Sequence, residues 1–120
     1  MMKKKGNYIG TEIDRKWWKR YRGESMLARG NGEFWMDEKG IRFHRLLTRI
    51  PLLIGWEEMK LASLGKWHAG RWVLGRPVLK IDFERKGQKL CAGFYLSEDW
   101  QQMAQLASDL NKRIQRSGRA

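Results

Sequence analysis

A chain of 120 residues with a single cysteine and a formal net charge of +12 is long enough for one domain with its own apolar core, and it excludes a disulfide framework. A lone thiol is typical of a reducing compartment, so we expect a cytoplasmic protein. The start MMKKKGNYIGTEI has no continuous apolar run, and the most apolar internal run, residues 46–56, is short and interrupted by Arg49 and Pro51, so we expect neither a signal peptide nor a membrane-spanning segment.

The positive charge is concentrated near the start of the chain. Residues 1–22 contain eight Lys and Arg residues against Glu12 and Asp14, so this fifth of the chain carries half of the net charge. A field of that sign attracts phosphate-bearing partners, which are lipid headgroups or nucleic acids.

The first predicted element is a short helix over residues 12–21 within a basic N-terminal extension, residues 1–23. Ile13, Trp17 and Tyr21 recur at a spacing of four, which is typical of one helical face. Thr11 is the predicted N-cap, and Asp14 follows at the spacing of a capping box.

The stretch RKWWKRYR, residues 15–22, spans this predicted helix and allows two interpretations. The apolar stripe can dock on the rest of the domain while the cations are solvated, since so short a helix is marginal alone in water. Alternatively, the tryptophans and cations bind an anionic partner. The sequence leaves both open.

Short extended segments separated by turns are expected next. We predict about six or seven antiparallel strands, over residues 25–28, 33–36, 41–47, 52–54, 60–67, 78–85 and 89–96. The clearest is 78–85, where Leu79, Ile81 and Phe83 alternate with charged residues. Lys86-Gly87 is a predicted tight turn that makes a hairpin with 89–96.

The last predicted element is an amphipathic helix over residues 98–115, with Ser97 as its N-cap and a tail at 117–120. Its apolar residues repeat at spacings of three and four and form one narrow stripe: Trp100, Met103, Ala107, Leu110 and Ile114. The order of elements predicts an α+β fold, in which a small antiparallel barrel or two packed sheets is closed by this helix.

Residues 33–114 resemble the pleckstrin-homology superfold, in particular the bacterial PH-like and GRAM-type domains. The segments that carry the resemblance are EFWMDEKGIRFHR, RIPLLIGWEEMKLASLG, PVLKIDFER, KLCAGFYL and SEDWQQMAQLASDL. It implies a PH-like domain over residues 24–116. It also implies a binding platform rather than an enzyme, since such domains bind phosphoinositides in some eukaryotic members and proteins or unknown ligands in many bacterial ones.

A second unusual segment is GKWHAGRW, residues 65–72, which reads as a turn joining two strands. Its tryptophans can insert at a membrane interface or stack on a base while Lys66 and Arg71 meet phosphates. Alternatively, the tryptophans cover one end of the barrel and the cations reach outward to solvent.

No catalytic or metal-binding motif is visible. His44 and His68 are the two histidines, and neither shows metal-ligand spacing with Cys91 or with a carboxylate. The adjacent Glu57 and Glu58 would point to opposite sides of a strand. We therefore expect no enzyme, no cofactor and no metal.

The function expected from the sequence is a non-catalytic PH-like binding module, peripheral to an anionic phospholipid membrane. The predicted binding residues are Lys16, Trp18, Lys19, Arg20, Arg22, Lys66, Trp67, His68, Arg71 and Trp72. Two alternatives remain: an RNA or single-stranded DNA binder that uses the same residues, and a protein-interaction or homo-oligomerisation domain in which the charge serves solubility.

Overall fold

The described part of the chain forms ten β-strands and one α-helix. The computed structural model describes residues 3–14, 16–20, 30–46, 51–72 and 74–117, and of Trp17, Arg20 and Arg71 it describes the backbone alone. The elements are β1 (Lys4–Ile13), β2 (Lys16–Arg20), β3 (Gly30–Met36), β4 (Gly40–Arg45), β5 (Leu52–Gly55), β6 (Met59–Gly65), β7 (Trp67–His68), β8 (Arg71–Trp72), β9 (Val78–Arg85), β10 (Gln88–Tyr95) and α1 (Trp100–Ser117).

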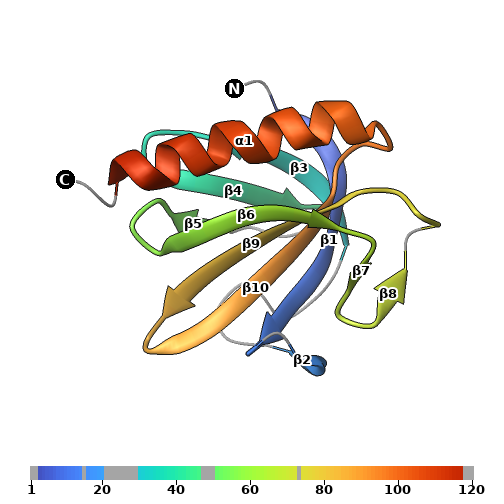
Figure 1. Ribbon diagram of the computed structural model, residues 1–120, viewed down its shortest axis with the longest axis horizontal. Helices are drawn as coiled ribbons and strands as arrows, with labels where there is room; N and C mark the ends of the chain where they lie inside the picture. Colours follow the sequence, from blue (N-terminus) through green and yellow to red (C-terminus); the bar gives the residue numbers. More distant parts are fainter. Residues whose placement is uncertain (1–2, 15, 21–29, 47–50, 73, 118–120) are drawn as a thin grey trace.

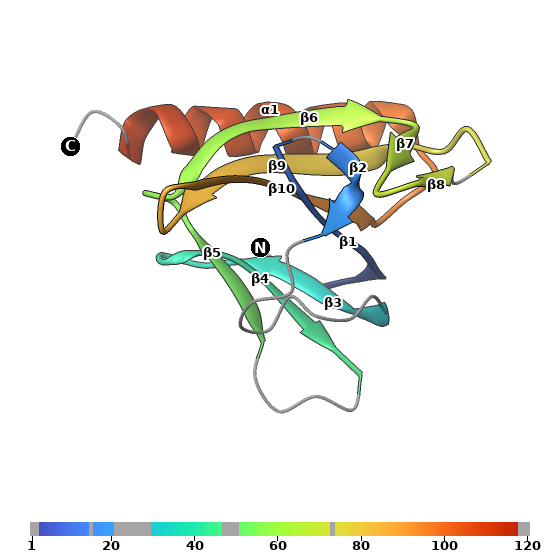
Figure 2. The same ribbon diagram turned by 90° about the horizontal axis from the view of Figure 1, so that it is seen from below.

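One bent antiparallel sheet contains most of these strands. Seven of them run in the order β5-β4-β3-β1-β10-β9-β6, β2 pairs with β1 beside this path, and β7 and β8 form a separate two-stranded sheet. Figure 2 shows that the half with β3, β4 and β5 crosses the half with β6, β9 and β10. The predicted α+β class, with antiparallel strands followed by a C-terminal helix, is confirmed.

The core lies between the two halves of the sheet and is centred on aromatic rings. The ring of Phe94 in β10 lies 5.5 Å, centroid to centroid, from each of the rings of Tyr8, Phe34 and Phe43. These residues come from β1, β3 and β4, and all four are fully buried. Burial of so many rings supplies the main apolar driving force of the fold.

The predicted terminal helix is confirmed, with its start shifted. Met103, Ala107, Leu110 and Ile114 are its buried residues, as the stripe predicts. The N-cap is Asp99 rather than Ser97, because Asp99 Oδ1 accepts the N–H groups of Gln101 and Gln102 at 2.9 and 3.1 Å.

Helix α1 runs along β6, the edge strand at one end of the sheet (Figure 1). Asn111 on the helix bonds twice to the backbone of Ala62: its Oδ1 accepts the N–H at 2.8 Å and its Nδ2 donates to the carbonyl at 2.9 Å. One side chain thereby satisfies both backbone groups of an edge residue that would otherwise be open to another strand.

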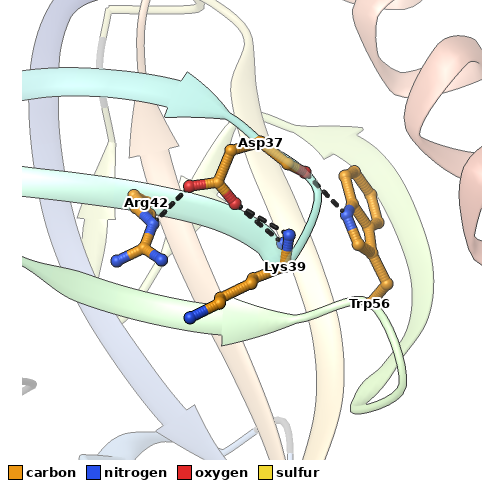
Figure 3. A network of polar contacts seen from close by, with 5 residues as sticks. Asp37, Lys39, Arg42 and Trp56 are labelled. Carbon is orange, nitrogen blue, oxygen red and sulfur yellow. Dashed lines mark hydrogen bonds and ion pairs between the residues drawn. The ribbon is translucent and has the colours of Figure 1, made fainter.

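Two carboxylates stabilise the turns next to β5, and the first of them is Asp37 in the β3–β4 turn. Asp37 accepts the backbone N–H of Lys39 and the Nε–H of Arg42, while Trp56 Nε1 donates to the Asp37 carbonyl (Figure 3). The bond from the Lys39 N–H is the main cause that lowers the pKa of Asp37. This cluster ties the β3–β4 turn to the residue that follows β5.

The second carboxylate is Glu58, between β5 and β6. Arg85 donates to its two oxygens at 2.7 and 2.8 Å, and also to the Leu53 carbonyl at 2.7 Å. The hydrogen bond from Arg85 lowers the pKa of Glu58, against the opposing effect of its partial burial.

The predicted helix over residues 12–21 is wrong. Residues 4–13 form β1, which lies between β3 and β10 in the middle of the sheet, and Lys16–Arg20 forms β2. Thr11 is not an N-cap: it is buried, and its Oγ1 hydrogen-bonds to the Tyr8 hydroxyl at 2.5 Å. Residues 4–13 are therefore part of the sheet and not an extension of it, whereas the strand predicted at 25–28 and residues 118–120 of the predicted tail lie outside the described residues.

Candidate functional site

The segment GKWHAGRW forms a two-residue hairpin, β7–β8. Trp67 pairs with Trp72 and His68 with Arg71, and the turn residues Ala69 and Gly70 have φ of 49° and 79°. Positive φ at both turn positions is the type I′ geometry, whose twist matches that of a hairpin. The turn predicted within residues 65–72 is confirmed, and it lies at Ala69-Gly70.

The two tryptophans of this hairpin face solvent as a pair. The side chains of Trp67 and Trp72 are 60% and 51% exposed, and their ring centroids lie 6.4 Å apart at an interplanar angle of 30°. The alternative in which they cover one end of the core does not fit these exposures. Adjacent exposed indoles are a feature of interaction sites, because exposed apolar surface has a cost in water.

The hairpin is fixed to the sheet by the residues between its tryptophans. His68 is only 1% exposed, and its Nε2 lies 2.9 Å from the carbonyl oxygen of Gly10 in β1. The N–H of Ala69 donates to Glu12 Oε2 at 2.7 Å, also in β1. His68 therefore anchors the hairpin and is not exposed to a membrane or a nucleic acid, although it was among the predicted binding residues.

Two glycines make room for this anchor. Gly10 has a φ of 122°, and the pairing of β1 with β10 shifts its register between Tyr8 and Gly10, so this carbonyl points out of the regular ladder. A Cβ on Gly93 in β10 would lie 2.2 Å from His68 Cδ2. Position 93 must lack a side chain for the imidazole to lie against the sheet.

A buried polar cluster lies beneath the hairpin. His68 Nδ1 is 3.7 Å from Glu12 Oε1, and one ligand atom from each of Glu12, His68 and Cys91 lies within 4.8 Å of the others. All three residues are buried. The expectation that no histidine is placed for metal binding with Cys91 or a carboxylate rested on sequence spacing, and the pairing of strands brings the three together.

The described part of the other unusual segment, residues 16–20 of RKWWKRYR, lies at the same end of the molecule. Trp18 in β2 is 61% exposed, Lys19 is exposed, and Lys16 is half-buried. β2 pairs with β1 at Glu12 and Ile13, next to the residues that hold the hairpin. Figures 1 and 2 both show β2 and the β7–β8 hairpin beside this half of β1.

We call the exposed described side chains of these two segments the candidate surface; its members are Trp18, Lys19, Lys66, Trp67 and Trp72. Of the other predicted cations, Arg20 and Arg71 have their backbones in β2 and β8, and Arg22 lies outside the described residues. The carboxylate nearest the hairpin, Glu12, is buried beneath it, and Asp14 in the β1–β2 turn is exposed. Aromatic and cationic side chains thus share one end of the fold.

A hollow on the outer side of β9 and β10 is a weaker candidate. Its lining mixes both signs of charge: Asp14, Lys60, Asp82, Phe83, Glu84, Lys89 and Leu90. The carboxylates and the lysines offset one another, so this surface has no preference for an anionic ligand.

The exposed tryptophans could be predicted from the sequence, but the residues that anchor their hairpin to the sheet were not. Glu12, Gly10, Gly93 and Cys91 were not predicted to belong to the site. The available signal was a glycine inside each of the segments YIGTEI and LCAGFY, since a glycine within a strand indicates a close approach of another group to its backbone.

Comparison of the chain with protein-family models and with curated proteins finds no match. Among the described residues, no helix is both long enough and apolar enough to cross a membrane.

Proposed function

We propose that the chain is a non-catalytic PH-like binding module that attaches to an anionic phospholipid surface through the candidate surface. The observation that carries the proposal is the pair of exposed indoles on an anchored hairpin, with the exposed Lys66 next to Trp67 in the chain. The curved antiparallel sheet with a C-terminal helix is the architecture that the PH-like resemblance implies, and it supports a binding platform.

Indole rings favour the interface between headgroups and acyl chains, where their apolar body is buried and the N–H stays near water. A hairpin that already holds two indoles in place loses little conformational entropy when it docks. The anchor through His68 and Ala69 is therefore part of the binding device, because it orders the tryptophans before they meet a surface.

The cations supply the second contribution. Each basic side chain close to an anionic leaflet contributes about 1 kcal/mol, so four to six acting together would give reversible attachment. Lys19 and Lys66 are exposed on the candidate surface, and Lys16, Arg20, Arg22 and Arg71 belong to the same two segments. Attachment of this kind weakens as salt rises.

Co-sedimentation with vesicles tests the proposal. The protein is mixed with phosphatidylcholine vesicles, or with vesicles of phosphatidylcholine and phosphatidylserine, at low salt and at about 0.15 M salt. We expect binding to the mixed vesicles at both salt concentrations and little binding to phosphatidylcholine alone. Binding to single-stranded DNA or RNA at 0.15 M salt, without binding to the mixed vesicles, would replace the proposal with the nucleic-acid alternative.

Matched variants separate a specific surface from net charge. Lys66→Glu and Lys112→Glu change the net charge equally, but Lys112 is exposed near the C-terminal end of α1, away from the hairpin (Figure 1). We expect Lys66→Glu to weaken vesicle binding about tenfold or more and Lys112→Glu to leave it nearly unchanged. Equal loss in both variants would mean that the charge of the whole molecule, and not this surface, drives binding.

A further inference from the structure

The buried cluster beneath the hairpin gathers three types of metal ligand from three separate strands. Glu12 comes from β1, His68 from β7 and Cys91 from β10, and β1 pairs with β10 at Glu12 and Cys91. The register of the sheet therefore places the carboxylate and the thiol on neighbouring strands. Imidazole, thiolate and carboxylate are together the ligands that Zn²⁺ binds in proteins.

Hydrogen bonds made by the other polar atom of each side chain orient the metal-ligand atoms of His68 and Glu12. His68 Nε2 lies 2.9 Å from the Gly10 carbonyl, so this nitrogen is the N–H donor and Nδ1 is the ring atom that faces Glu12. Glu12 Oε2 accepts the N–H of Ala69, and Oε1 is the oxygen directed at the imidazole. A metal-binding histidine that donates its other ring N–H to a backbone carbonyl is the usual arrangement around protein-bound metals.

The distances are close to those of a tetrahedral site. Ligands about 2.0–2.3 Å from a zinc ion at tetrahedral angles lie about 3.3–3.6 Å from one another. Nδ1 and Oε1 are 3.7 Å apart, and the whole set of three ligand atoms lies within 4.8 Å. Side-chain rotations that shorten these separations by a few tenths of an ångström to about 1.5 Å bring the three ligand atoms into one coordination sphere.

The charges also balance. A thiolate and a carboxylate together offset the two positive charges of Zn²⁺, so the bound group is neutral, which suits a site whose residues are all buried. Binding forms the bonds Zn–S, Zn–N and Zn–O, and the thiol proton of Cys91 is released to solvent.

We propose that Glu12, His68 and Cys91 form a Zn²⁺ site with a water in the fourth coordination position, and that the ion fixes the β7–β8 hairpin to the central strands of the sheet. The ion would join β7, the first strand of the hairpin, to β1 and β10 beneath it. Zinc binding at this cluster does not require the hairpin to bind a membrane, so the two proposals are tested separately.

Titration of untagged, reduced protein with Co²⁺ tests the site. Cobalt replaces zinc with the same ligands, and a thiolate ligand gives a sulfur-to-cobalt charge-transfer band in the near ultraviolet. We expect this band to saturate at one Co²⁺ per chain, with intense visible bands of tetrahedral cobalt, and to disappear when Zn²⁺ is added. A folded protein without the charge-transfer band would overturn the proposal and leave the cluster as a hydrogen-bonded anchor.

Variants assign the ligands. Cys91→Ser should abolish the charge-transfer band, and Glu12→Gln and His68→Gln should each weaken cobalt binding at least about 100-fold, because each removes a ligand. His44→Gln alters the other histidine, on β4, and should bind as the wild type does. A charge-transfer band that persists in folded Cys91→Ser protein would contradict the assignment.

A measurement on the unaltered chain avoids variants that fail to fold. With Zn²⁺ in large excess over its dissociation constant, the melting temperature should rise by about 10 °C relative to chelator-treated protein, because the ion binds the folded state alone. Zn²⁺ should also slow the reaction of Cys91 with a thiol reagent. An unchanged melting temperature together with an unchanged thiol reaction rate would count against the site.

Discussion

At the residue scale, Glu58 and Arg85 form an ion pair that joins the β5–β6 connection to β9. The side chains of Arg85 and Glu58 are 11% and 24% exposed, and two hydrogen bonds join them. Glu58→Gln should lower the free energy of unfolding by about 1–2 kcal/mol at neutral pH, as measured by urea denaturation. Glu84→Gln is the control: its pair with Lys60 is 4.0 Å long and exposed, so we expect a change below about 0.5 kcal/mol.

The same pair makes stability depend on pH. Hydrogen bonds lower the pKa values of Glu58 and Asp37 in the folded protein, so both carboxylates stabilise the fold when they are ionised. This stabilisation is complete above their unfolded pKa values and is lost as the pH falls through the folded values, which begins at about pH 5. The melting temperature should fall over this range, and the fall should be smaller in Glu58→Gln; identical acid profiles for the two proteins would contradict the assignment.

Gly93 is the residue on which the hairpin anchor depends most directly. Gly93→Ala would place a Cβ 2.2 Å from the His68 ring, which must then leave its position against β10. We expect a loss of about 1–3 kcal/mol in the free energy of unfolding and faster tryptic cleavage at Lys66, because the hairpin is no longer fixed.

Gly30→Ala provides the matched control for this substitution. A Cβ at position 30 meets nothing within 4 Å, so the variant should unfold and be cleaved as the wild type is. If Gly93→Ala matched it in both measurements, the close contact between β10 and His68 would not be needed for the anchor.

At the element scale, the contact between α1 and β6 both holds the helix and closes a sheet edge. Asn111→Ala leaves the N–H and carbonyl of Ala62 without these bonds on an edge strand. We expect a loss of about 1–2 kcal/mol and concentration-dependent self-association, which sedimentation velocity measures. Lys112→Ala changes the next, exposed helix residue and should remain as stable and as monomeric as the wild type.

Elements whose pattern is local were predictable from the sequence. The β9–β10 hairpin and α1 show clean periods of two and of three to four, and their predicted ranges agree with the structure to within two residues at each end. β1 was not recognised because it lies between β3 and β10, where the consecutive residues Tyr8 to Glu12 are all buried and no alternation remains. The spacing of Ile13, Trp17 and Tyr21 then imitated a helix across the turn from β1 to β2.

At the scale of the whole molecule, strand order decides which distant residues meet. RKWWKRYR and GKWHAGRW are the two unusual segments of the sequence, and the structure places the described part of the first, residues 16–20, and the β7–β8 hairpin of the second beside the same half of β1. The contact among Glu12, His68 and Cys91 could not be predicted from spacing, because it depends on the register of β10 against β1 and on the room left at Gly93. The composition of the two segments therefore indicated the exposed tryptophans and lysines, whereas the buried cluster of Glu12, His68 and Cys91 could be found only from the fold.

Membrane attachment as proposed requires the paired indoles of the hairpin to enter the lipid interface. The most direct measurement is quenching of tryptophan fluorescence by vesicles of phosphatidylcholine and phosphatidylserine whose acyl chains are brominated, in the wild type, in Trp67→Phe/Trp72→Phe and in Trp35→Phe. Trp35 lies on β3, outside the candidate surface, with the Lys3 ammonium 4.6 Å from its ring centroid, so its loss should change the quenching little. We expect strong quenching of the wild type and of Trp35→Phe, and weaker quenching of Trp67→Phe/Trp72→Phe at equal vesicle binding, where Trp18 of the candidate surface remains. Equal quenching in all three proteins, or none in the vesicle-bound wild type, would show that the two indoles do not enter the lipid.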